Sequence, residues 1–132
     1  MLQRIIAPKA PSPKGPYSHA VRAGDFIFVS GQGPIDPETN QWKLSDAAGE
    51  TRATLENIRA ILHAAGAELS DVVKCSVFLT DITDFAAMNQ VYAEFFGDIR
   101  PARTTVQAVL PGRDTKVEID CVAYKPVSWS KP

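Results

Sequence analysis

The sequence predicts an α+β fold in which one mixed sheet of six strands carries two helices on a single face. Six segments show the alternating or short apolar runs of strands, and two show apolar residues at helical spacing. Their order along the chain is β-β-β-α-β-α-β-β. Two helices can cover only one face of such a sheet. The 132 residues suit a single domain spanning 1–132.

The first three strands are predicted on either side of a proline-rich arm, which we define as residues 7–18. Its four prolines fix the backbone and remove amide donors, so the arm should be extended and unable to join a ladder fully. Gly24-Asp25 predicts a hairpin turn. The run Phe26 to Val29 is apolar on both faces and needs cover on both sides. The three strands are expected at 2–6, 17–23 and 26–30.

Two amphipathic helices are predicted, each followed by a glycine that favours helix termination. In the first, Leu55, Ile58 and Leu62 form the apolar stripe, whereas His63 lies on the polar stripe and should be a surface residue. Asp84 is the expected cap of the second. The helices should span 50–65 and 84–96. A long loop is predicted at 31–49, and its middle is expected to cross the surface without a role.

The remaining strands are predicted at 71–80, 103–109 and 116–124. In the last one, four apolar residues share one face, whereas Glu118, Asp120 and Val122 share the other. In the strand at 71–80, alternation places four apolar side chains on the face toward the core, namely Val73, Cys75, Val77 and Leu79. The opposite face mixes apolar and polar side chains, which predicts association of several copies.

Composition excludes several classes of function. The net charge is −1 and no basic block is present, so neither nucleic acid nor a membrane is an expected partner. No apolar run reaches the roughly 18 residues of a membrane span, and a cytoplasmic location is expected. Cys75 and Cys121 lie in strand-like runs and are expected to be reduced core thiols. No metal-ligand spacing, nucleophile elbow or phosphate loop occurs, so neither a metal nor another cofactor is expected.

Two ionisable residues are candidates for chemistry. Arg103 opens a strand just after a proline turn, and its guanidinium could grip a carboxylate with two parallel hydrogen bonds. A plain ion pair is the alternative for Arg103. Glu118 lies mid-strand on the polar face, where it could hold a water or accept a proton. Its alternative is a cross-strand ion pair with Lys74 or Lys116.

Tyr17, Ser30 and Gly31 surround the first hairpin. The Tyr17 hydroxyl could donate to a substrate oxygen, although the ring could equally pack under the proline-rich arm. Ser30-Gly31 ends the buried strand, where backbone can approach a ligand closely.

Several segments, in order and at matching spacing, resemble the RidA (YjgF/YER057c/UK114) family of reactive-intermediate imine deaminases. They include APSPKGPYSHAV, FIFVSGQGPIDPET, PARTTVQAVLPG and KVEIDCVAY, and the resemblance runs from about Ile5 to Tyr124. It implies a chorismate-mutase-like fold and a homotrimer with a central barrel-like core and clefts between subunits. It also implies hydrolysis of small enamines and imines, such as 2-aminoacrylate or 2-iminobutanoate, to 2-keto acids and ammonia without a cofactor or metal.

The resemblance also implies roles for individual residues. Arg103 would hold the substrate carboxylate, Glu118 would position the attacking water, and Tyr17 would stand at the cleft edge. Phe85 would form an aromatic wall from the neighbouring subunit, and the backbone of Thr105 would contact the ligand. The predicted substrate-binding residues are therefore Thr105, Ser30, Gly31, Phe85 and Asn89.

The chain departs from close relatives of this family at some positions. They often carry cysteine where Thr105 stands and glutamine where His19 stands. The run Arg103-Thr104-Thr105-Val106 is also similar to that of 2-aminomuconate deaminases of the same superfamily. Two alternatives therefore accompany the prediction: a 2-aminomuconate-type deaminase, and a non-catalytic trimer that binds small carboxylates.

Overall fold

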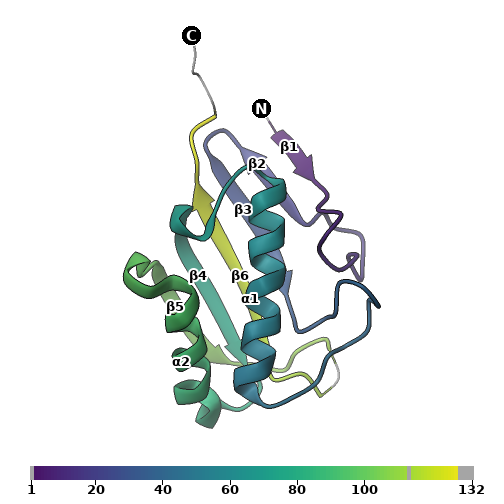
Figure 1. Ribbon diagram of the computed structural model, residues 1–132, viewed down its shortest axis with the longest axis vertical. Helices are drawn as coiled ribbons and strands as arrows, with labels where there is room; N and C mark the ends of the chain where they lie inside the picture. The colour runs from purple at the N-terminus through teal and green to yellow at the C-terminus, as the bar shows by residue number, and fades with distance from the viewer. Residues whose placement is uncertain (1, 113, 128–132) are drawn as a thin grey trace.

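The computed structural model describes residues 2–112 and 114–127, which form one six-stranded sheet. The strands lie in the order β1-β2-β3-β6-β4-β5 (Figure 1). Strands β4 and β5 run parallel, whereas the other neighbouring pairs run antiparallel, so the predicted mixed sheet is confirmed. The bounds are β1 Leu2–Ile5, β2 Ala20–Ala23, β3 Phe26–Gln32, β4 Val72–Leu79, β5 Ala102–Gln107 and β6 Val117–Tyr124.

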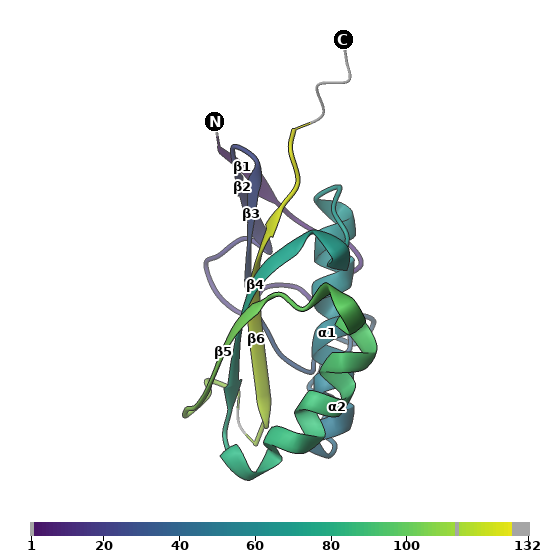
Figure 2. The same ribbon diagram turned by 90° about the vertical axis from the view of Figure 1, so that its left-hand side faces the viewer.

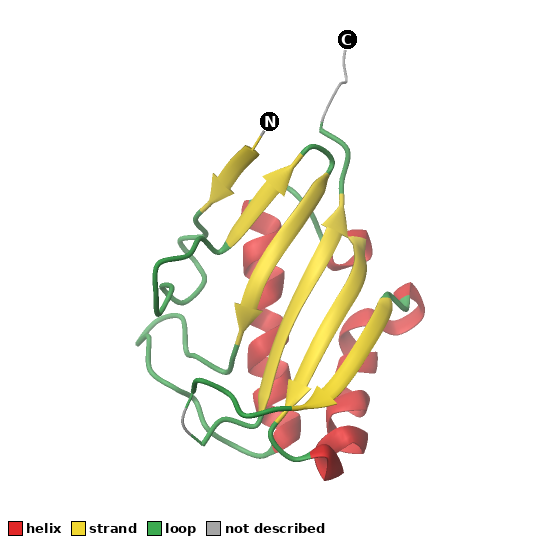
Figure 3. Ribbon diagram, turned by 180° about the vertical axis from the view of Figure 1, so that it is seen from behind, coloured by secondary structure: helices red, strands yellow, loops and turns green. Residues whose placement is uncertain are grey.

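Both long helices, α1 (Ala47–Ala64) and α2 (Phe85–Phe96), lie on the same face of the sheet (Figure 2). Leu55, Ile58 and Leu62 of α1 are fully buried, as predicted. They pack over the sheet residues whose side chains point toward the helices. The opposite face carries no helix, which Figure 3 shows in front of the viewer. None of the described helices is long and apolar enough to span a membrane.

Several element boundaries differ from the prediction because of local hydrogen bonds. Helix α1 begins at Ala47 and not at residue 50, because the Asp46 carboxylate accepts from the Gly49 amide at 2.8 Å. Asp84 is the N-cap residue of α2, as predicted, but its side chain makes no capping hydrogen bond. Strand β2 begins only at Ala20, and β3 continues to Gln32 through a bulge.

The predicted direction of the side chains along β4 is wrong at one residue, Val73. Its register against β6 shifts between Val72 and Lys74, so Val72 is buried and Val73 is 44% exposed. A bulge of this kind inserts one residue and reverses the alternation before it. Cys75, Val77 and the rest of the strand keep the predicted arrangement.

The two cysteines behave as predicted. Cys75 and Cys121 are register partners on β4 and β6, and both are buried free thiols. Burial raises the pKa of each thiol, so both remain protonated and unreactive.

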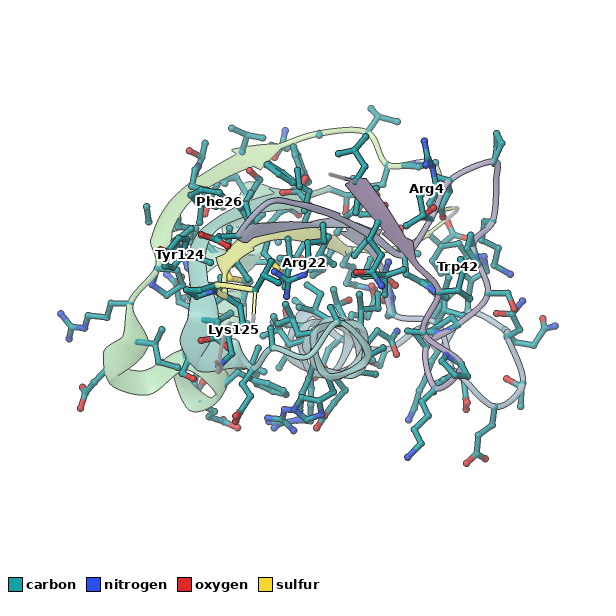
Figure 4. The ribbon with its side chains drawn as sticks, turned by 90° about the horizontal axis from the view of Figure 1, so that it is seen from above. Arg4, Arg22, Phe26, Trp42, Tyr124 and Lys125 are labelled. Atoms are coloured by element: carbon teal, nitrogen blue, oxygen red, sulfur yellow. The ribbon has the colours of Figure 1, made fainter. Side chains whose placement is uncertain are left out.

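The helix-free face, which we call the open face, is partly apolar. Phe26, Phe28 and Tyr124 are between 43% and 48% exposed there. The rings of Phe26 and Tyr124 meet edge to face with their centres 5.2 Å apart. Figure 4 shows the two side chains next to each other, seen from above. Ile27 and Val29 point the other way into the core, so β3 is apolar on both faces as predicted. No described segment of this chain covers the open face.

Candidate functional site

A cavity of about 330 Å³ lies where β3 ends and β6 begins. The proline-rich arm, the bulged end of β3, the loop before α1 and the loop before β6 supply its walls. We call it the Glu118 cavity. Among its lining residues are Lys14, Tyr17, His19, Gly31, Trp42 and Glu118. It therefore unites Tyr17, Gly31 and Glu118, three of the residues predicted from the sequence.

Glu118 is a half-buried carboxylate that forms no ion pair with a described residue. The ion pairs expected with Lys74 or Lys116 do not form. The Lys74 ammonium donates to Thr104 Oγ1 at 2.9 Å, and that of Lys116 lies 3.7 Å from Glu50. Burial raises the pKa of Glu118, and the charge of Asp120 raises it further. Both effects disfavour the charged form and make the carboxylate a better proton acceptor near neutral pH.

The bulge in β3 brings the backbone against this carboxylate. Val29 pairs with Cys121 and Gln32 pairs with Ile119, so Ser30 and Gly31 together face one residue of β6. A Cβ atom at Gly31 would lie 2.5 Å from Glu118 Oε2. Only glycine leaves the carboxylate in its present position.

Ser30 and Tyr17, which were also predicted in this region, both form hydrogen bonds with the proline-rich arm. Ser30 Oγ donates to the Ser18 carbonyl at 2.7 Å, so its hydroxyl ties the arm to β3 and does not line the cavity. The Tyr17 hydroxyl accepts from the Lys14 amide at 3.1 Å, under the arm, and it also lines the cavity. Because that bond uses an acceptor site, the Tyr17 proton stays free to be donated.

Arg103 lies in a second group at the β5 edge of the sheet. Its guanidinium carbon stands 4.7 Å from the centre of the Tyr92 ring and 5.5 Å from that of Phe85. Its Nη1 contacts Met88 Sδ at 3.9 Å. We call these four residues the Arg103 cluster. Aromatic faces attract a guanidinium without using its donors in the ring plane. No ion pair forms with a described residue, so these donors can serve a ligand.

Thr105 and Asn89 flank the Arg103 cluster. Thr105 follows Arg103 by two residues on the same face of β5, and its hydroxyl oxygen is buried without a hydrogen-bond partner among the described residues. Asn89 lies one helical turn after Phe85 on α2 and is partly buried. Both lie at the edge formed by α2 and β5, next to the Arg103 cluster.

The strand register separates the two groups of predicted residues. Arg103 pairs with Cys75, whose side chain points into the core beneath the helices. Glu118 pairs with Phe78 on the open face. Register partners point to the same face of a sheet. Arg103 and Glu118 therefore leave the sheet in opposite directions, and one chain does not unite them in a single pocket.

Among the residues of the Glu118 cavity that were not predicted as site residues are Trp42, Lys14 and His19. Trp42 lies against two glycines: a Cβ atom would stand 3.1 Å from its ring at Gly33 and 2.6 Å at Gly112. The middle of the long loop was expected to cross the surface, and the structure adds that Trp42, which is 39% exposed, packs along the cavity wall. Lys14 and His19 come from the arm and its end. A lone tryptophan in a loop of unusual length was the signal available for Trp42.

Comparison with known proteins gives a consistent result. The protein-family model described as Endoribonuclease L-PSP matches residues 7–125. A RutC family protein of Pyrococcus horikoshii is 50% identical over 125 residues, which cover 95% of this chain and 99% of that protein. TdcF of Escherichia coli, named a reactive intermediate deaminase, is 38% identical and covers 95% of this chain and 98% of its own.

Solved structures share the fold as well. The crystal structure of RidA from Psychrobacter sp. PAMC 21119 has a TM-score of 0.88 at 41% identity, covering 92% of this chain and 98% of that one. The structure of TdcF with bound serine has a TM-score of 0.87 and covers 93% and 98%.

Proposed function

Because this chain belongs to the RidA/YjgF/L-PSP (RutC) family, we propose that it hydrolyses small carboxylated enamines and imines to 2-keto acids and ammonia. The observation that carries the proposal is the pair of complementary groups: an arginine with free donors, and a carboxylate with raised pKa. The Arg103 guanidinium can bind the carboxylate of a substrate, and the Glu118 carboxylate can accept a proton from a water. TdcF with bound serine shows that a relative accepts a small molecule bearing a carboxylate.

The chemistry needs little beyond positioning. Arg103 binds the substrate carboxylate, and the Phe85 ring confines the substrate beside it. Glu118 takes a proton from a water whose oxygen attacks the imine carbon, while the C=N electron pair moves to nitrogen, which gains a proton from solvent. In the adduct the amine takes up the proton held by Glu118, and the hydroxyl gives up its own to solvent. Collapse of this adduct restores a carbonyl, breaks the C–N bond and releases ammonia. Such acid–base help is worth about 10²–10⁴-fold, and positioning adds to it. Tyr17 donates to the substrate and orients it.

The site is completed by two copies of the chain in our proposal. Arg103 and Glu118 point away from opposite faces, so the Arg103 cluster of one subunit meets the Glu118 cavity of the next. A homotrimer in which each subunit plays both parts has three such sites. The same assembly would cover the partly apolar open face, including Phe28 and Tyr124.

A dicarboxylic substrate of the 2-aminomuconate type is the second candidate. The Glu118 cavity offers about 330 Å³, with the Lys14 ammonium 5.9 Å from the Trp42 ring at its wall. A cation beside an indole suits a second carboxylate on an unsaturated chain. A panel of imines with one or two carboxylates ranks the two candidates by kcat/KM.

The test generates 2-aminoacrylate or 2-iminobutanoate in situ and follows release of the 2-keto acid. We expect acceleration by the wild type and a loss of at least about 100-fold in Arg103→Ala, the size of two charge-assisted hydrogen bonds. Arg52→Ala is the matched control, because Arg52 is exposed and pairs with Glu94 on the helix layer. Binding of a small carboxylate without any acceleration would support the non-catalytic trimer instead.

A further inference from the structure

His19 is a buried histidine whose two ring nitrogens both engage backbone groups of the proline-rich arm. It is 2% exposed. The Ala7 amide donates to Nδ1 at 2.8 Å, and Nε2 lies 2.6 Å from the Pro11 carbonyl oxygen. An amide can only donate and a carbonyl can only accept, so Nδ1 is the acceptor and Nε2 carries the proton. The geometry selects one neutral tautomer.

These bonds join the arm to the sheet. The His19 carbonyl accepts from the Ser30 amide at 3.0 Å, which fixes the residue against β3 next to the bulge. Its side chain then reaches Ala7 and Pro11, which are 12 and 8 residues earlier in the chain. An arm with four prolines has few amides of its own to offer a ladder. The imidazole therefore supplies a bridge that the arm's backbone cannot make.

The arm held in this way is one wall of the Glu118 cavity. Pro11, Lys14 and Tyr17 line the cavity together with His19 itself. Lys14 also reaches across to the opposite wall, because its ammonium donates to the Asn40 carbonyl at 3.0 Å and stands over Trp42. Displacement of the arm would open the cavity and move Tyr17 away from Glu118.

We infer that neutral His19 is the positioning residue that holds the proline-rich arm, and with it Tyr17, over the Glu118 cavity. An imidazolium has donors on both nitrogens and cannot accept from the Ala7 amide. Protonation of this ring would therefore break its bond from the Ala7 amide and loosen the arm. The expected effect on KM rests on the proposed function, whereas the expected movement of the arm does not.

The charged groups around His19 are few. Lys14 of the arm and Glu118 of β6 share its cavity, together with the Tyr17 hydroxyl. Strand β3 carries no charged residue. Arg22 of β2 donates to the Lys125 carbonyl, on the side seen in Figure 4. The other charged groups of the arm and its surroundings line different hollows or the surface, namely Lys9, Glu56, Arg59, His63 and Arg4.

The test compares His19→Gln with His19→Leu. The glutamine amide offers one acceptor and one donor and does not titrate, whereas leucine offers neither. His63→Gln is the matched control, because His63 is the only other histidine and is exposed. All variants carry Trp129→Phe, so Trp42 is the one remaining tryptophan. Its emission reports contact with Lys14 and the arm as the pH is lowered from 8 to 5.

We expect the Trp42 emission of the parent and of His63→Gln to change on acidification. That of His19→Gln should change less than that of the parent, because only Glu118 of the same cavity then responds to acid. His19→Leu should show the signal of the loosened arm at every pH. In the deaminase assay, KM of the parent should rise by about tenfold on acidification, the effect of losing one buried hydrogen bond, relative to His19→Gln. Nitrogen-15 shifts should show the Nε2–H tautomer at pH 8.

Identical pH profiles of emission in the parent and His19→Gln would overturn the inference, as would an Nδ1–H tautomer. If neither the parent nor any variant accelerates imine hydrolysis, the proposed function fails. The Trp42 emission and the nitrogen-15 shifts of His19 still test the role of His19 in that case. If His19→Leu does not fold, the comparison of the parent with His19→Gln decides alone.

Discussion

Arg103 and Glu118 project from opposite faces of the same sheet, Arg103 against α2 and Glu118 toward the open face. They lie on β5 and β6, with β4 between them in the strand order. Side chains so arranged cannot act on one small substrate within one chain, whereas they can do so between two copies. This relationship leads directly to a complementation experiment.

Arg103→Ala and Glu118→Gln should each abolish activity alone, yet regain part of it when the two chains are co-assembled. A site between subunits is intact when its arginine comes from the Glu118→Gln chain and its glutamate comes from the Arg103→Ala chain. With random mixing this holds for about a quarter of the sites. The measurement is kcat of co-expressed, doubly tagged oligomers. Absence of any recovery would place both residues of a site in the same chain.

Glu118→Gln should also stabilise the protein at neutral pH while it lowers kcat. The folded-state pKa of Glu118 is raised above its usual 4.5 by burial and by Asp120. The folded state therefore binds the proton more tightly than the unfolded state. Ionisation of Glu118 therefore lowers the free energy of unfolding as the pH rises above 4.5, and this loss is absent at lower pH. Thermal unfolding should show a higher Tm for the variant at pH 7.5 and none of this gain at pH 4. A lower Tm at pH 7.5 would contradict the expectation.

Gly31→Ala should reduce activity with little effect on stability. The new methyl group would meet Glu118 Oε2, the far end of a side chain that can rotate away. The carboxylate would then leave its position in the cavity, and kcat should fall by about tenfold or more. Gly24→Ala is the converse control. Gly24 has φ of +62° with nothing within 4 Å of a Cβ atom, so it should lose about 1 kcal/mol and keep kcat. Equal kcat in both variants would argue against the role of Gly31.

Glu50→Gln should destabilise the loops that flank the cavity. Glu50 is fully buried, and its carboxylate accepts from the Lys116 amide at 2.7 Å and the Ser45 amide at 3.2 Å. A glutamine has only one amide oxygen, so one of these donors would face another donor. We expect a loss of about 1–3 kcal/mol in the free energy of unfolding. Lys116→Met keeps both amide bonds and removes only the lysine, whose side chain is 40% exposed and lies 3.7 Å from the buried carboxylate, so it should cost less than Glu50→Gln. Chemical denaturation of the two variants measures the difference.

The sequence by itself determined the elements and the direction of Glu118. Periodicity is a local property: residues two apart on a strand share a face, so the buried Val117 and Ile119 place Glu118 away from the helices. The same reasoning predicted the helices α1 and α2, the core cysteines and the uncovered face. It failed at Val73, because a bulge shifts the alternation and leaves no clear mark in the residues before it.

Only the tertiary structure decided where Arg103 points and what surrounds Glu118. The strand that carries Arg103 reads ARTTVQ, which has no apolar alternation, so its facing depends on pairing with Cys75 on a distant strand. The cavity likewise joins the arm, the loop with Trp42 and the start of β6, which only folding brings together. Side-chain direction along a strand is local, whereas the register between strands follows from packing of the whole sheet. For that reason the sequence could single out Arg103 and Glu118 as candidates, but it could not show that they stand on opposite faces.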